Sequence, residues 1–243
     1  MLHGLAWLET DYRTLFCLRE DGRIERENDP DLSPGPRFWL GGCAEGNIFG
    51  IRADVPDDIA ETLQALAVTE PPFVHPAVPE HMETYLSVLA GDVAVEHNFG
   101  IIYELPHGLS FESDARLIDS ATGEGQELLR SWTARGIPDG LLDLGFREIA
   151  DFWAPWCAVA IGDEIASLAF AARLSDIGAE LGLVTAKAFR GRRLAAAAVA
   201  GWTRLAALQS RTLFYSTDRR NIASQHVAAR LGLRLAGASL RIA

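Results

Sequence analysis

The sequence has few of the residues that mark several classes of protein. Among its 243 residues are only three cysteines, Cys17, Cys43 and Cys157, which lie far apart along the chain. An odd count without metal-ligand spacing argues against a disulfide framework and predicts a reducing, cytoplasmic environment. The two longest apolar runs, 154–162 and 194–203, reach about half of the ~18 residues that a membrane helix requires. We therefore expect no membrane-spanning segment, and the N-terminus does not match a signal peptide.

Positive charge is also scarce. The chain has 22 Lys and Arg residues against 33 Asp and Glu residues, so its formal net charge is −11, and Lys187 is its only lysine. This balance disfavours broad attraction to nucleic acid or to an anionic membrane. His75 and His81 have no acid or cysteine partners at ligand spacing, so no metal site is expected. What the chain does have is an ordinary globular composition, with 49% hydrophobic residues.

The pattern of helices, strands and breakers divides the chain into two halves, 1–110 and 111–243. In the first half we expect a loop at 29–36, strands at 38–40 and 47–52, helices at 56–68 and 80–89, with Gly91 ending the second helix, and one or two strands in 93–105. The glycine-rich stretch 41–46 is not followed by a helical pattern, so a hairpin loop is favoured over a phosphate loop. No motif in this half identifies a function.

The second half also mixes helices and strands. We expect strands at 115–119, 157–161, 164–172, 180–185, 212–217 and from 233 onward, and helices at 124–135, 139–150, 194–208 and 223–231.

The most informative segment is a strand, a basic turn and an alanine-rich helix. The strand 181–185 leads into Lys187, Arg190, Gly191, Arg192 and Arg193, and the helix follows at once. A helix start offers unsatisfied backbone N–H groups and a positive dipole end, which together favour an anion. Gly191 allows close approach of the backbone to a ligand. The segment suits a pyrophosphate, although it is neither a P-loop nor a dinucleotide fingerprint.

Two motifs in this half resemble those of one family. Residues 190–195 (RGRRLA) resemble the acetyl-CoA signature of GNAT-superfamily N-acetyltransferases, Gln/Arg-x-x-Gly-x-Gly/Ala, with Arg193 where the signature has glycine. Downstream, 214–224 (FYSTDRRNIAS) followed by Leu231-Gly232-Leu233 resembles the second conserved stretch. The resemblance runs from about residue 111 to residue 243 and does not cover 1–110. It implies an α/β (α+β) fold for the second half, with a mixed, mostly antiparallel sheet flanked by helices. The first half is expected to form a smaller α+β domain before it.

The resemblance also implies acetyl-CoA as cosubstrate and assigns residues to it. The backbone of the third strand would pair with the pantetheine arm, and the amides at the start of the helix would hold the pyrophosphate. Asn221 would bond the pantetheine region, and Ser224 would face the same groove. The cofactor-binding set is therefore Leu183, Val184, Thr185, Arg190, Gly191, Arg192, Arg193, Leu194, Ala195, Asn221 and Ser224.

The catalytic assignment implied by the resemblance is less complete. Glu180 stands at the start of the strand, where the family often has an acid, and would serve as general base. Many family members carry a tyrosine acid where this chain has Ala228. Nearby substitutes in the sequence are Tyr215, Ser216, Ser224 and His226, of which Tyr215 and Ser224 are taken as candidates. Because no cysteine lies near the motif, direct attack by an amine in a ternary complex is favoured over an acyl-enzyme.

Other interpretations remain open from sequence alone. The chain could be a non-catalytic CoA-binding or regulatory module, which the alanine at position 228 slightly favours. An aminoacyl-transferring relative that uses charged tRNA is disfavoured by the net charge of −11. Locally, Glu180 could be a surface acid, Asn221 a helix cap, and Trp153, Trp156 and Phe152 either core packing or walls of an acceptor site. The acceptor is left as a small-molecule or peptide amine, and a homodimer is one option.

Overall fold

The computed structural model describes residues 3–90 and 95–243. The chain forms two compact units. One contains Met1–Glu104, Ser216–Gln225 and Arg234–Ala243, and the other contains Leu105–Tyr215 and His226–Leu233. The boundary thus passes through strand β10 (Thr212–Asp218) and helix α7 (Ile222–Arg230). The unit that contains Met1–Glu104 is called the first unit below, and the unit that contains Leu105–Tyr215 is called the second unit. In the described residues, no helix is long and apolar enough to cross a membrane.

The first unit is built on antiparallel strands in the order β4-β3-β11-β5. Strand β11, from the far end of the chain, lies between β3 and β5. The elements of this unit are α1 (Gly4–Leu15), β1 (Phe16–Leu18), β2 (Ile24–Glu27), β3 (Phe38–Cys43), β4 (Gly46–Ile51), α2 (Asp57–Thr69), α3 (Met82–Ala90), β5 (His97–Glu104) and β11 (Arg234–Ile242).

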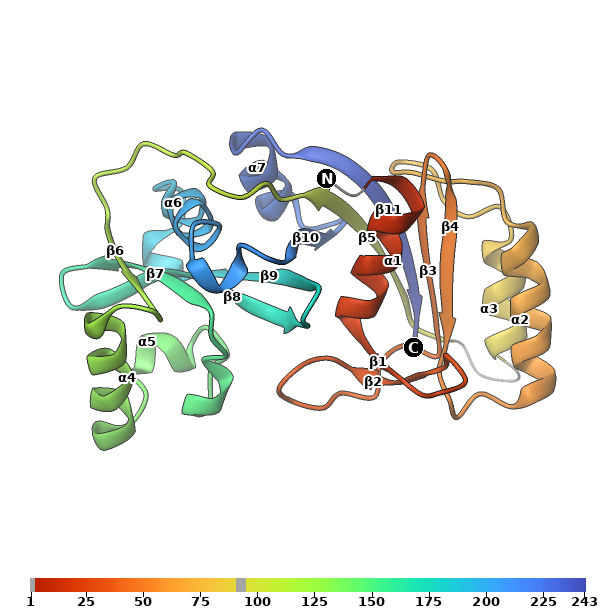
Figure 1. Cartoon of the computed structure of the whole chain (residues 1–243), viewed down its shortest axis with the longest axis horizontal. Coiled ribbons are helices and arrows are strands. Elements are labelled where there is room, and N and C mark those ends of the chain that lie inside the picture. Colours follow the sequence, from red (N-terminus) through yellow and green to blue (C-terminus); the bar gives the residue numbers. More distant parts are fainter. Residues whose placement is uncertain (1–2, 91–94) are drawn as a thin grey trace. The chain divides into compact units, whose positions relative to one another are not determined.

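Alternation along β3 divides the core of the first unit between two faces. Phe38 and Leu40 join the cluster formed with α2 and α3, which includes Leu63 and Tyr85. Trp39 points the other way and stacks on Tyr12 of α1, with ring centroids 5.3 Å apart. Both faces of this sheet are therefore covered by helices, as Figure 1 shows.

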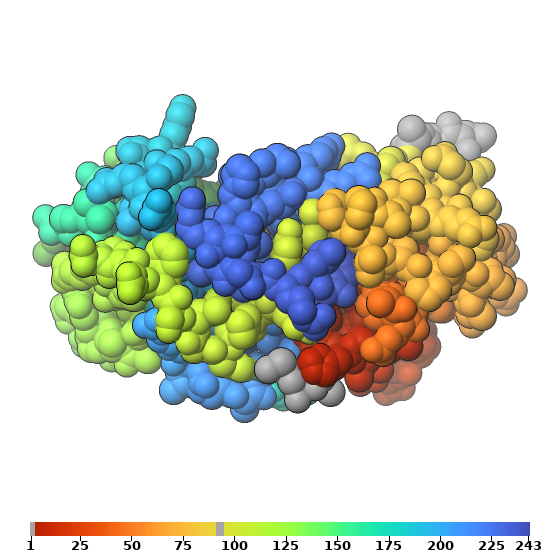
Figure 2. Space-filling view, turned by 90° about the horizontal axis from the view of Figure 1, so that it is seen from above, coloured from red at the N-terminus to blue at the C-terminus, as the bar shows by residue number. Residues whose placement is uncertain are grey.

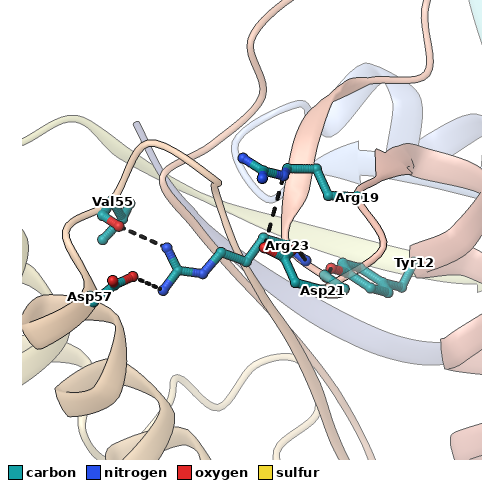
Figure 3. A network of polar contacts seen from close by, with 7 residues as sticks. Tyr12, Arg19, Asp21, Arg23, Val55 and Asp57 are labelled. Atoms are coloured by element: carbon teal, nitrogen blue, oxygen red, sulfur yellow. Dashed lines mark hydrogen bonds and ion pairs between the residues drawn. The ribbon is translucent and has the colours of Figure 1, made fainter.

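Figure 3 shows how the β1–β2 hairpin is fixed to the start of α2. Arg23 donates to the carbonyl of Val55 at 3.0 Å and to Asp57 at 2.9 Å. The hydroxyl of Tyr12 donates to the carbonyl of Gly22 at 3.4 Å. The Asp57 carboxylate lies in the first turn of α2, where the helix dipole favours negative charge. The network is a structural anchor, and nothing in it points to a ligand.

The second unit has the strand order β10-β9-β8-β7-β6, in which only the β10–β9 pair is parallel. One sheet face packs against an apolar cluster that includes Trp132, Leu141 and Phe152, and the other packs against α6. Its elements are β6 (Arg116–Asp119), α4 (Gly123–Arg135), α5 (Asp139–Leu142), β7 (Trp156–Ile161), β8 (Glu164–Leu174), β9 (Gly178–Thr185) and α6 (Leu194–Trp202), with 3-10 turns at Ile149–Asp151, Lys187–Phe189 and Ala206–Leu208.

The predicted mixture of helices with a mostly antiparallel, mixed sheet is confirmed. The helix expected at 139–150 is wrong beyond Leu142, because Gly145 takes a left-handed conformation (φ +99°) that ends helical geometry. The helix expected at 194–208 ends at Trp202. There the carbonyl of Thr203 accepts from the backbone N–H of Gly108 at 3.1 Å, which replaces the next helical hydrogen bond.

In residues 1–110, the observed elements differ further from those expected from the sequence. The glycines at 41 and 42 lie within β3, and the hairpin turn is formed by Ala44 and Glu45. Helix α1 was not anticipated, although Leu8, Tyr12 and Leu15 have helical spacing and are all buried. Gly91, expected to end a helix, and residue 93, expected to begin a strand, lie outside the described residues.

Candidate acyl-CoA site in the second unit

The site begins with an unpaired edge on strand β9. On one side β9 pairs with β8 along Ala179–Thr185. On the other side, β9 pairs with β10 through Gly178, Ala179 and Glu180. Among the described residues, β10 therefore leaves the backbone of Leu181–Thr185 unpaired on this edge. Such an edge offers N–H and C=O groups to an extended ligand.

A basic turn follows this edge. The guanidinium Nε of Arg190 donates to the carbonyl of Thr185 at 3.2 Å, so the side chain folds back onto the end of β9. The guanidinium of Arg192 lies over the Phe189 ring, 5.4 Å from its centroid. Lys187, Arg190, Arg192 and Arg193 are all exposed. In the space-filling view of Figure 2, this part of the chain is found by its cyan to light-blue colour and lies at the surface. The turn therefore concentrates positive charge within an acidic protein.

The turn ends at the start of α6, which has no side-chain cap. Arg193 occupies the N-cap position, and its side chain makes no capping hydrogen bond. The first backbone N–H groups of a helix have no intrahelical partner. Without a side-chain cap, they are available to an anion at the positive end of the dipole.

Arg193 adopts a left-handed conformation, with φ 65° and ψ 10°. This geometry explains why the resembled signature has glycine at the position, since a Cβ is disfavoured there. Gly191 also has positive φ, +79°, and a Cβ there would meet nothing within 4 Å. The space over Gly191 is thus open, as a turn that approaches a ligand requires.

Helix α6 is packed so tightly that its position is fixed. Its residues from Ala196 to Trp202 are all buried. A Cβ on Gly201 would lie 2.5 Å from the sulfur of Cys157, so only glycine allows this approach. The indole N–H of Trp202 donates to the carbonyl of Pro155 at 2.7 Å. The alanine run therefore holds the N-terminus of the helix rigidly against the sheet.

Glu180 is buried, so its interpretation as an exposed surface acid is wrong. The residue is only 8% exposed, and its carboxylate lies 3.7 Å from the guanidinium of Arg173. A bulge between Ala171 and Arg173 sets Arg173 opposite Glu180 in the register. Bulges of this kind re-aim side chains and are common beside active sites. The carboxylate thus lies beside a basic partner, at the end of the stretch of β9 that β10 leaves unpaired.

The other catalytic candidates lie elsewhere. In a parallel pair, facing residues share a sheet face, and Phe214 faces Glu180. Tyr215, which is buried, therefore points to the opposite face from Glu180. Ala228, where many family members have tyrosine, is fully buried. This division between faces could not be read from the sequence, because it depends on the strand register.

Asn221 and Ser224 belong to the first unit in the division of the chain. The side-chain oxygen of Asn221 accepts from the backbone N–H of Ser224 at 3.1 Å, so Asn221 caps the start of α7 as anticipated. Both residues follow β10 directly along the chain. Their predicted roles toward the pantetheine region and in catalysis remain predictions.

Thiol and metal chemistry have little support in this part of the chain. Burial, with a smaller contribution from Asp119, raises the pKa of the Cys157 thiol to about 12. The thiol is therefore protonated at neutral pH and is a poor nucleophile. Residues 3–90 and 95–243 contain no group of three or more His, Cys, Asp or Glu side chains placed to hold a metal ion.

The family model of the acetyltransferase (GNAT) domain matches residues 74–234, which is well over half of the chain. The chain belongs to the GNAT acetyltransferase family. The match covers the basic turn, α6 and Asn221. It also begins upstream of residue 111, where the motif resemblance started. No curated protein matches the chain.

Solved structures agree with the GNAT fold. A GCN5-related N-acetyltransferase from Kribbella flavida is 14% identical, with a TM-score of 0.51, and the alignment covers 99% of this chain and 96% of that one. A GNAT-family acetyltransferase from Colwellia psychrerythraea is 17% identical and has a TM-score of 0.44, and the alignment covers 93% of this chain and 79% of that one. A GNAT-family structure from Novosphingobium aromaticivorans is 18% identical and covers 61% and 65%, with a TM-score of 0.43. This chain thus spans slightly under two thirds of the last one. At 14% identity, the likeness to the Kribbella flavida structure concerns the fold alone.

Proposed function

We propose that this GNAT protein transfers an acetyl or other short acyl group from acyl-CoA to an amine by direct attack in a ternary complex. The observation that carries the proposal is the unpaired edge Leu181–Thr185 running into the uncapped N-terminus of α6. An extended amide-bearing arm suits the edge, and a pyrophosphate suits the helix start. Residues 183–185 and 190–195 are the ones that would bind the acyl-CoA.

The remaining chemistry is assigned to residues of the same strand. Glu180 takes a proton from the ammonium form of the acceptor, directly or through a water molecule. A backbone N–H of the edge polarises the thioester carbonyl. The amine nitrogen then bonds to the acyl carbon as the carbon–sulfur bond breaks, and the electron pair leaves with the thiolate. The second proton, which the new amide nitrogen loses, passes to that thiolate or to solvent. Thiolate is a sufficiently good leaving group that a missing tyrosine acid at position 228 does not prevent the reaction.

The first experiment measures thermal unfolding with and without acetyl-CoA. At about 100 times the dissociation constant, the ligand should stabilise the wild type by about 2.7 kcal/mol, or roughly 5–10 °C for a chain of this size. The double variant Arg190→Glu, Gly191→Glu should lose this shift because it places negative charge at the phosphate site. Arg130→Glu, at an exposed position of α4, is a charge-reversal control away from this site and should keep the shift.

A thiol-release assay with a panel of amines then separates the two candidate functions. An acetyltransferase should release CoA in an amine-dependent manner. A non-catalytic CoA-binding module, which the buried Ala228 still favours, would show the thermal shift without turnover. Absence of the shift at millimolar acetyl-CoA would contradict both.

A further inference from the structure

We propose that Phe170 is a specificity-determining residue, whose ring forms an aromatic wall beside Glu180 and selects amines that carry an apolar or aromatic body. The inference rests on the proposed acetyl transfer, because it concerns the acceptor side of the same site. All the residues that carry it lie on β8, β9 and the segments packed on them within the second unit.

The register of β8 and β9 places Phe170 next to the candidate base. On one face, three successive rows of the antiparallel pair are Leu168 with Val184, Phe170 with Gly182, and Arg173 with Glu180. Because Glu180, Gly182 and Val184 alternate with residues of the other face, they share one face of the sheet. Phe170 therefore occupies the row beside the carboxylate, on the same face.

Gly182 lets the ring of Phe170 cross over β9. A Cβ on Gly182 would lie 2.4 Å from the ring carbon Cζ of Phe170 and 2.5 Å from Cε2. The ring thus lies directly above the backbone of Gly182, between the side chains of Glu180 and Val184. This is also the stretch of β9 whose other edge β10 leaves unpaired. An amine that approaches Glu180 from this face meets the ring.

The surroundings of Phe170 are aromatic on its far side. Its ring meets that of Phe146 at an interplanar angle of 72°, with centroids 5.4 Å apart, and Phe146 stacks on Phe152 at 4.6 Å. Those two rings are buried, whereas Phe170 is only half-buried. The cluster therefore fixes the ring from behind and leaves part of it accessible. The apolar surface of a ligand would be buried there.

The competing explanation is structural. Aromatic rings often cover a cross-strand glycine simply to protect the sheet. That role predicts equal losses for all acceptors when the ring is removed, whereas a specificity role predicts losses that depend on the acceptor. The test therefore compares two amines of similar reach, 2-phenylethylamine and 1,5-diaminopentane.

The experiment measures kcat/KM for both amines in the wild type, Phe170→Leu and Phe170→Ala, together with acetyl-CoA affinity. We expect the wild type to favour 2-phenylethylamine and Phe170→Ala to lose that preference by about tenfold or more, with the acetyl-CoA dissociation constant changed less than about twofold. Phe170→Leu keeps more apolar volume than Phe170→Ala, so it serves as the test variant if the alanine variant does not fold. Phe146→Leu, behind the wall, is the matched control: it should lower thermal stability similarly but keep the ratio between the amines.

Several results would overturn the inference. These are a wild-type preference for 1,5-diaminopentane, equal losses for both amines in the Phe170 variants, and the same change of ratio in Phe146→Leu. Turnover with other amines but neither of these two would also overturn it, while leaving the proposed acetyl transfer intact. If no amine is acetylated, the proposed function fails. The role of Phe170 is then tested separately by NMR titration of the protein with 2-phenylethylamine. Weaker binding in Phe170→Leu than in the wild type supports the role, and unchanged or absent binding overturns it.

Discussion

At the scale of single residues, the environment of a side chain decides its chemical role. Glu180 and Cys157 are both buried in the second unit. The carboxylate has a guanidinium 3.7 Å away, while burial and the Asp119 charge hold the thiol in its protonated form. Two reactive residue types of similar burial therefore have different surroundings: the carboxylate has a basic partner, and the protonated thiol is suited to packing.

Glu180→Gln should lower kcat about 100-fold or more, because loss of a positioned general base costs this much. The acetyl-CoA dissociation constant should remain close to that of the wild type, since the side chain does not belong to the proposed phosphate or pantetheine contacts. Steady-state kinetics and calorimetric titration measure the two quantities. A kcat within a few-fold of the wild type would contradict the assignment of Glu180 as base.

The raised pKa of Cys157 predicts how stability depends on pH. The thiol has a pKa of about 12 in the folded chain and of about 8.5 when unfolded. The unfolded chain therefore loses this proton first, and the thiol's contribution to stability, complete below pH 8.5, falls as the pH rises toward 12. The difference in unfolding free energy between wild type and Cys157→Ala should shrink by about 1.4 kcal/mol per pH unit above pH 9. Parallel urea titrations at pH 8 and pH 10 test this, and a constant difference would refute it.

At the scale of elements, the junction between β9 and α6 combines a strand edge, a basic turn and a buried helix. The motif residues were visible in the sequence because their spacing is local. The strain at Arg193 was not visible, although its departure from the signature marked the position. In the structure, this departure from the signature costs conformational energy, because Arg193, a residue with a Cβ, occupies a left-handed conformation.

Arg193→Gly should therefore be more stable than Arg193→Ala by about 1 kcal/mol. Both variants remove the same charge, so their comparison isolates the backbone effect. Chemical denaturation of the two variants without ligand measures the difference. Equal unfolding free energies, or a more stable alanine variant, would show that the left-handed conformation at this position costs little.

At the scale of the whole molecule, residues far apart in the sequence fix the last strand. Arg241 of β11 donates to the buried Glu27 of β2, which is 214 positions away, and its guanidinium lies 5.4 Å from the Phe16 ring centroid. Burial lowers the pKa of Arg241 to about 10, with the charge of Asp11 acting in the opposite direction. On the same strand, the more exposed Arg234 pairs with Glu104. The two pairs provide an internal comparison of buried and exposed ions.

Arg241→Met should lower the free energy of unfolding by about 3–5 kcal/mol, because it leaves the Glu27 carboxylate buried without its guanidinium. Arg234→Met, at the more exposed pair, should cost less than about 1 kcal/mol. Urea denaturation of both variants gives the comparison. The double variant Arg241→Met, Glu27→Gln should recover part of the loss, and similar costs for the two single variants would contradict the role of burial.

The basic turn, the helix after it and the motifs that point to the family, and through it to the class of fold, could be recognised from the sequence. These features depend on residues within short segments, where local spacing carries the information. The unpaired edge of β9, the position of Arg173 opposite Glu180 and the contact of Phe170 with Gly182 could be found only in the folded chain. These depend on strand register, and a shift by one residue would exchange the two faces of a strand. Gly182 within an apolar strand was the one local sign of a close approach.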